Sequence, residues 1–156
     1  MAEPYRIEGA NRRSRWVITC DHASKRVPDD VAGGDLGLPA EDMERHIAYD
    51  IGAAGVSRRL GEVLDAPVIL SDFSRLVIDP NRGEDDPTLL MKIYDGSIIP
   101  ANRHADADEI ERRLACYHRP YHRAVDALIA SRENPVILAI HSFTPHFVGR
   151  PPRPWH

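Results

Sequence analysis

Three short apolar segments alternate along the chain with two longer segments whose apolar residues recur every three or four positions. The short segments are RWVITC (15–20), PVIL (67–70) and PVILAIH (135–141). They are rich in β-branched residues, which predicts buried strands. The longer segments, about 40–64 and 106–131, have the period of an amphipathic helix. This alternation of strands and helices predicts an α/β fold.

The two predicted helices each have one continuous apolar face. The face of the first comprises Met43, Ile47, Ile51 and Ala54, and that of the second comprises Ile110, Leu114, Tyr117, Tyr121, Val125 and Leu128. Pro39 stands at or just before the start of the first helix, where proline is favoured. Pro120 lies inside the second helix and is expected to kink or split it.

Polar residues follow each of the three predicted strands. His22 follows the first strand, the segment 75–82 follows the second, and His141 follows the third. Strands that are apolar throughout are typical of a mainly parallel or mixed sheet flanked by helices. Ligands of such sheets bind beyond the carboxyl ends of the strands. We therefore expect the three polar clusters to form one site.

Length, charge and cysteine content narrow the class of protein. A chain of 156 residues suits one domain with its own core. The net charge of -4 gives no reason to expect binding to nucleic acid or to an anionic membrane. The sequence has no apolar run of membrane-spanning length and no signal peptide pattern. Cys20 and Cys116 are the two cysteines, so we expect a reducing cytoplasm, that of a bacterium.

The histidines at the strand ends indicate a metal site. Rigid strands hold both His22 and His141 at the edge of the sheet, and a catalytic zinc ion needs about three protein ligands and an open position. The alternative is that each histidine bonds to nearby backbone. Asp21 precedes His22 and is expected to point to the opposite side of an extended chain.

The third ligand is sought in the first predicted helix. His46 and Asp50 stand at i and i+4, so both share a helix face that can turn toward the strand ends. Asp50 is the candidate metal ligand or general base, or the carboxylate that orients a metal-bound histidine. His46 is the second candidate catalytic residue. A His–Asp pair on the helix surface is the alternative.

Arginines and an asparagine after the second strand are typical of a carboxylate-binding site. Arg82 with Asn81 suits a substrate carboxylate, because guanidinium matches carboxylate in a two-point fork. Arg75 offers a second fork or polarises a carbonyl. In the competing interpretation the arginines form structural salt bridges with Asp72, Asp79 or Asp85.

The segment YHRPYH (117–122) carries two histidines four positions apart. Metals use this spacing, but Pro120 between them breaks regular geometry. Helix packing, or a place at the rim of the site, is therefore favoured for His122.

Together these motifs resemble the N-formylglutamate amidohydrolase family. The resemblance rests on CDHASKRVP, HIAYDIGA, SRLVIDPNR, YHRPYH and IHSFTP, in this order, and covers about residues 15–156. It implies a three-layer α/β/α fold similar to that of zinc-dependent exopeptidases and deacylases. It also implies hydrolysis of N-formyl-L-glutamate to L-glutamate and formate, late in histidine degradation. The chain is expected to be one domain, 1–156, that lacks the family's C-terminal part, where the general base of the zinc exopeptidases lies.

The resemblance also assigns roles to residues. It implies that Zn²⁺ is bound by His22, His141 and a carboxylate, for which we nominate Asp50. His46 and Asp50 match family positions, and the DPNR segment resembles the one that holds the substrate carboxylate in related deacylases. The expected partner is a small N-acyl amino acid. The alternatives are a catalytically impaired carboxylate-binding domain of the same fold, or a related zinc deacylase or peptidase.

Overall fold

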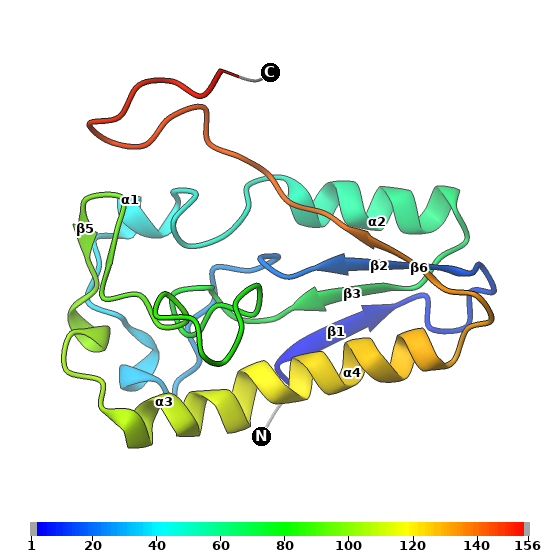
Figure 1. Ribbon diagram of the computed structural model, residues 1–156, viewed down its shortest axis with the longest axis horizontal. Helices are drawn as coiled ribbons and strands as arrows, with labels where there is room; N and C mark the ends of the chain where they lie inside the picture. The colour runs from blue at the N-terminus through cyan, green and yellow to red at the C-terminus, as the bar shows by residue number, and fades with distance from the viewer. Residues whose placement is uncertain (1–2, 155–156) are drawn as a thin grey trace.

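In the computed structural model, which describes residues 3–154, a four-stranded mixed sheet lies between helices (Figure 1). In chain order the elements are β1 (Tyr5–Glu8), β2 (Trp16–Cys20), η1 (Ala32–Gly34), α1 (Ala40–Met43), α2 (Ala53–Val63), β3 (Val68–Ser71), β4 (Ile93–Tyr94), β5 (Ser97–Ile98), η2 (Pro100–Asn102), α3 (Ala107–Arg113), the π-turn η3 (Leu114–His118), α4 (Arg119–Ala130) and β6 (Val136–Ala139). The strand order is β1-β3-β2-β6. The three predicted strands are β3, β2 and β6, which are adjacent and parallel. The antiparallel edge strand β1 was not predicted.

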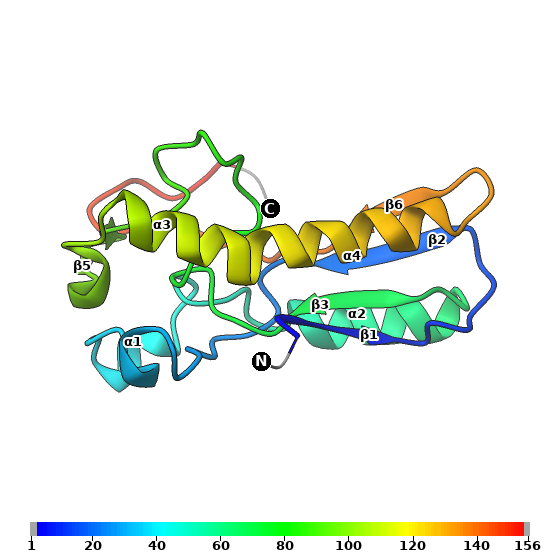
Figure 2. The same cartoon turned by 90° about the horizontal axis from the view of Figure 1, so that it is seen from below.

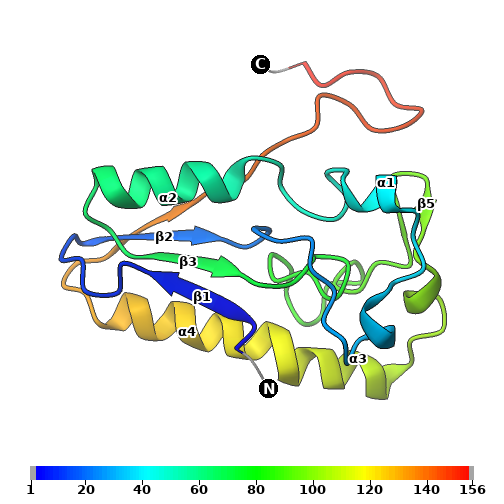
Figure 3. The same ribbon diagram turned by 180° about the vertical axis from the view of Figure 1, so that it is seen from behind.

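Helices α2 and α4 cover opposite faces of the sheet (Figures 1 and 3). Side chains alternate between the faces of a strand. Val17 and Ile69 accordingly pack with Tyr121 of α4, whereas Ile18 and Val68 pack on the α2 side. The result is the predicted three-layer α/β/α arrangement, and the predicted fold class is confirmed.

The first predicted helix, 40–64, is wrong as a single element. It consists of the short α1 and of α2, with turns between them. The backbone N–H of Asp50 donates to the carbonyl of His22 at 2.9 Å, so a tertiary bond replaces a helical one. Gly52 then takes a left-handed φ of 82°, which glycine adopts without strain, and α2 begins.

The second predicted helix is present, and it is interrupted just before Pro120, as expected. The segments α3, η3 and α4 follow one another, with α4 beside the sheet and α3 beyond the ends of its strands (Figure 2). The π-turn η3 immediately precedes α4, whose second residue is Pro120. A wider turn accommodates the proline ring, which would clash with the preceding turn of a regular helix. No helix within residues 3–154 has the length and apolar content needed to cross a membrane.

A small hairpin, β4–β5, was missed at the sequence level. Its two-residue turn is Asp95-Gly96, both with positive φ, and an Asp-Gly pair is a strong hairpin signal. The chain after β6 returns to this hairpin. There the backbone N–H of Val148 donates to Oδ1 of Asp95 at 2.7 Å. The tail therefore lies along one side of the site described next.

Candidate metal centre and binding cavity

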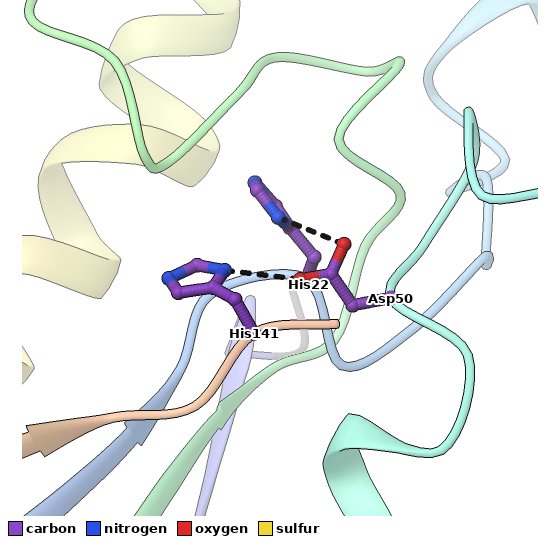
Figure 4. Close-up of side chains that lie close together, drawn as sticks. All are labelled: His22, Asp50 and His141. Carbon is purple, nitrogen blue, oxygen red and sulfur yellow. Dashed lines mark hydrogen bonds and ion pairs between the residues drawn. The ribbon is translucent and has the colours of Figure 1, made fainter. Parts of the chain in front are cut away.

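Chain segments that follow β2 and β6 meet the segment before α2 at the carboxyl edge of the sheet (Figure 4). His22 lies in the turn after β2, His141 follows β6, and Asp50 lies in the turns before α2. One potential ligand atom from each of the three lies within 4.8 Å of the others. The structure thus brings together the three residues nominated from the sequence as metal ligands.

His22 divides its two ring nitrogens between two carboxylates. Nε2 lies 2.7 Å from Oδ1 of Asp79, which is fully buried. Nδ1 lies 3.4 Å from Oδ1 of Asp50 and has no hydrogen-bond partner among the described residues. A histidine that donates one N–H to a carboxylate presents the lone pair of its other nitrogen to a metal. The buried Nδ1 of His22 therefore fits a metal ligand.

His141 repeats this arrangement with another outer carboxylate. Its Nδ1 lies 3.0 Å from Oδ2 of Asp50, and its Nε2 lies 3.4 Å from Oδ2 of Asp21. Oδ1 of Asp21 accepts a 2.6 Å hydrogen bond from the hydroxyl of the buried Tyr121. The prediction that Asp21 points away from the site is wrong. Strand β2 ends at Cys20 and a turn follows, so the alternation of side chains stops there.

The electrostatics of the cluster favour a cation. Hydrogen bonds to Asp21 and Asp50 raise the pKa of His141 to about 9, against the effect of burial. Burial raises the pKa of Asp50, but hydrogen bonds from His141 and His22 outweigh it and hold that pKa well below its ordinary range. A divalent metal bound here would displace the imidazole protons. Two imidazoles and one carboxylate suit zinc.

Arg75 is buried beside the cluster and forms the structural salt bridge of the competing interpretation. One terminal guanidinium nitrogen lies 2.7 Å from Oδ2 of Asp79, and the other lies 3.7 Å from Oδ1 of Asp50. The guanidinium also lies 5.2 Å from the ring centroid of Tyr94. Arg75 still lines the cavity, so its charge acts on both the carboxylates and any ligand.

His46 lines the same cavity but does not share a helix face with Asp50, and that part of the prediction is wrong. Both residues lie in the turns between α1 and α2. Nε2 of His46 is 3.2 Å from Oδ2 of Asp95, and its ring packs near Tyr94 and Phe147. Burial lowers the pKa of His46, so its imidazole is neutral at pH 7.

A cavity of about 410 Å³ opens beside the cluster. Every site residue nominated from the sequence lines it: His22, His46, Asp50, Arg75, Asn81, Arg82 and His141. Tyr94, Phe147 and Arg153 also line it and were not nominated. Within residues 3–154, Asp50 is the one acidic side chain in this lining, against three arginines. This balance favours an anionic ligand.

The DPNR segment (79–82) connects the cavity to the buried carboxylate of Asp79. The backbone N–H of Asn81 donates to Oδ1 of Asp79 at 2.9 Å. Arg82 donates from Nε to Oγ1 of Thr88 at 3.1 Å and from a terminal nitrogen to the carbonyl of Asn81 at 3.1 Å. From the sequence, Asp79 was expected only as a salt-bridge partner of an arginine. Its place in this motif was the available signal for its contact with His22.

Comparisons with known proteins identify the family of the chain. The profile of the N-formylglutamate amidohydrolase family matches residues 14–154, nearly the whole chain. The chain belongs to this family. The predicted resemblance is thereby confirmed, while the roles assigned to individual residues stay predictions.

Two solved structures are similar to this member of the family. The gene product Atu2144 from Agrobacterium tumefaciens is 34% identical with a TM-score of 0.88, and the match covers 96% of this chain and 60% of that one. The N-formylglutamate amidohydrolase from Ralstonia eutropha JMP134 is 21% identical with a TM-score of 0.59, and the match covers 83% and 52%. The second match shows the fold alone. The chain thus spans between half and two thirds of the length of these relatives.

Proposed function

We propose that this chain hydrolyses the amide bond of an N-acylated acidic amino acid, most simply N-formyl-L-glutamate, to L-glutamate and formate. The observation that carries the proposal is the His22–Asp50–His141 cluster beside an arginine-lined cavity. Family membership supports this class of reaction. We propose the bacterial cytoplasm as its setting, as the low cysteine content indicates, and histidine degradation as its pathway, as the family resemblance implies.

Zinc is the proposed cofactor, with His22, Asp50 and His141 as its ligands. Three protein ligands leave a coordination position open, as in catalytic zinc sites. A bound zinc ion would polarise the formyl carbonyl and lower the pKa of water toward neutrality. As a ligand, Asp50 is unsuited to accept the proton as well, because its two oxygens already face His22 and His141.

His46 is the proposed proton carrier. Its lowered pKa keeps the imidazole neutral and able to accept a proton from the attacking water. The carboxylate of Asp95, 3.2 Å from Nε2, stabilises the imidazolium that forms. His46 then gives this proton to the amine nitrogen as the C–N bond breaks.

Arg82 and Asn81 are proposed to bind a carboxylate of the substrate. Both line the cavity, and a guanidinium beside an amide matches carboxylate geometry. Arg75 is bound to Asp79 and is assigned a different role. Its positive charge beside the cluster stabilises negative charge that develops on the amide oxygen.

A second candidate function is carboxylate binding without catalysis. It is favoured by the lack of a free carboxylate in the cavity lining of the described residues, since Asp50 is engaged with both histidines. A related zinc deacylase or peptidase of the same fold is a third candidate. Formate release separates the first two candidates, and comparison of N-formyl with longer N-acyl substrates separates the third.

The test of the proposal is formate release from N-formyl-L-glutamate by the zinc-loaded protein, with Arg82→Ala as the diagnostic variant. Loss of a charge-assisted bond to the substrate is expected to raise KM about 10- to 100-fold with a smaller change in kcat. Arg123→Ala, an exposed arginine on α4, is the matched control and should leave KM unchanged. Absence of formate from the zinc-loaded wild type would contradict catalysis, and an unchanged KM for Arg82→Ala would contradict the binding role.

Asp21→Asn is expected to weaken zinc binding about 10- to 100-fold, as loss of an outer carboxylate partner does elsewhere. The amide is less able than the carboxylate to hold Nε2 of His141, which lies 3.4 Å from Oδ2 of Asp21. Competition with a chromophoric chelator measures the affinity. Asp126→Asn, an exposed aspartate on α4, is the control. Equal zinc affinity of Asp21→Asn and the wild type would exclude this role for Asp21.

A further inference from the structure

The rings of His118 and His122 lie close together, tilted by 46°, and the proposed reaction does not use them. Their ring centroids are 4.4 Å apart, with His118 at the end of η3 and His122 in the first turn of α4. Nε2 of His118 lies 2.9 Å from the carbonyl oxygen of Arg82. Nε2 of His122 lies 2.9 Å from the carbonyl oxygen of Pro80. Both rings therefore contact the backbone of the DPNR segment.

These contacts define the direction of both hydrogen bonds. A carbonyl oxygen accepts and has no proton to give, so each Nε2 must carry a hydrogen and donate it. Burial lowers the pKa of His118, which keeps that ring in a neutral form. Nε2 of each histidine is occupied by a backbone carbonyl of the loop. The pair is thus a hydrogen-bond donor unit directed at one loop.

The loop has open space on both of its sides. Asn81 and Arg82 line the cavity at the metal-ligand cluster, and they also line a second cavity of about 510 Å³. His118 and His122 belong to the lining of that second cavity. Apolar packing therefore surrounds this loop less completely than it surrounds a core segment, and hydrogen bonds carry more of its positioning.

Successive residues of the loop are tied at their backbones. The carbonyl of Pro80 is bound by His122, the N–H of Asn81 by Asp79, and the carbonyl of Arg82 by His118. The Asp79 tie comes from the metal-cluster side, and the two histidine ties come from α4 and η3. Removing His122 leaves the carbonyl of Pro80 without its hydrogen bond, while His118 still holds the carbonyl of Arg82.

We propose that His118 and His122 are positioning residues that hold Asn81 and Arg82 in the orientation that binds the substrate carboxylate. The proposal rests on the proposed function, because it assigns its effect to the carboxylate-binding end of the site. Neither histidine touches the cavity at the metal-ligand cluster. Their loss should therefore change substrate binding and leave zinc affinity unchanged.

His122 is the better position to test, because it is partly exposed whereas His118 is buried. His122→Phe keeps an aromatic ring beside His118 but removes the donor, and His122→Gln keeps an N–H donor near the position of Nε2. We expect KM for N-formyl-L-glutamate to rise about tenfold in His122→Phe and to stay within about threefold in His122→Gln, the scale of one hydrogen bond. The kcat and the zinc affinity should match the wild type in both. An unchanged KM in His122→Phe, or an equal rise in both variants, would overturn the proposal.

A second measurement separates this inference from the proposed function. Amide hydrogen exchange at Asn81 and Arg82, in protein without substrate, reports the order of the loop directly. Exchange should be faster in His122→Phe than in His122→Gln and the wild type. If the wild type releases no formate but this difference in exchange is found, the proposed function is contradicted, whereas the positioning of the loop by His122 is supported. Equal exchange rates at Asn81 and Arg82 in both variants would contradict the positioning role of His122, whether or not the protein releases formate.

Discussion

His141→Ala should lose zinc binding by more than about 100-fold, because even an outer partner of a metal ligand is worth 10- to 100-fold. The substitution removes one of the three proposed ligands and leaves Asp50 without its 3.0 Å contact to Nδ1. The side chain is 20% exposed, so the protein should still fold. Formate release should fall with the zinc content.

Two measurements check this expectation. Chelator competition gives the zinc affinity, and thermal unfolding with added zinc gives the linked stability. A free zinc concentration of 100 times the wild-type Kd should stabilise the wild type by about 2.7 kcal/mol and His141→Ala by less than about 0.4 kcal/mol. His146→Ala, an exposed histidine in the tail, is the matched control and should behave as the wild type. Wild-type zinc affinity in His141→Ala would refute the assigned ligand.

Asp79→Ala should cost about 3–5 kcal/mol of the free energy of unfolding, the cost of breaking a buried ion pair on one side. Asp79 is fully buried and accepts hydrogen bonds from His22, Arg75 and the backbone N–H of Asn81. Its removal leaves the buried guanidinium of Arg75 without its 2.7 Å partner. Because whole domains are stable by about 5–15 kcal/mol, this variant should lie close to unfolding.

Urea unfolding at pH 7 measures this loss, with Asp126→Ala on the exposed face of α4 as the control. The control should stay within about 0.5 kcal/mol of the wild type. A loss in Asp79→Ala as small as that of the control would show that the buried network contributes little.

Acid adds an independent check on Asp79. Burial raises the pKa of Asp79, but hydrogen bonding and charge from His22, with the charge of Arg75, outweigh it and lower that pKa to about 2. A carboxyl whose folded pKa is depressed contributes stability above its unfolded pKa of about 4 and loses it as the pH falls through the folded value. The wild type should therefore lose this contribution between about pH 4 and pH 2. Asp79→Asn should lack this part of the acid dependence.

Local patterns were enough to predict the three parallel strands of the sheet and most of the residues that line the candidate site. The apolar runs before His22 and His141 define strands, and a parallel sheet brings their carboxyl ends to one edge. The nominated residues therefore meet in one cavity although only their spacing relative to strands was known. The Asp95-Gly96 hairpin was predictable on the same grounds and was overlooked.

The position of Asp50 was beyond local reasoning. The apolar residues of 40–64 do recur with a helical period. In the fold, however, the N–H of Asp50 donates to the carbonyl of His22 instead of to a carbonyl of a continuous helix. The contacts of the outer carboxylates, Asp79 and Asp21, were likewise beyond prediction from local sequence. Asp79 meets His22 across 57 residues, and Asp21 meets Tyr121 across 100.

The amino-acid sequence by itself thus determined the α/β layering and the strand ends at which His22 and His141 stand, because hydrophobic periodicity and chain direction act locally. The tertiary structure alone decided which carboxylate faces which histidine nitrogen, and that the His118–His122 pair donates to the DPNR loop. Those contacts join segments far apart in the chain. Their geometry depends on turns and helix placement that no single segment encodes.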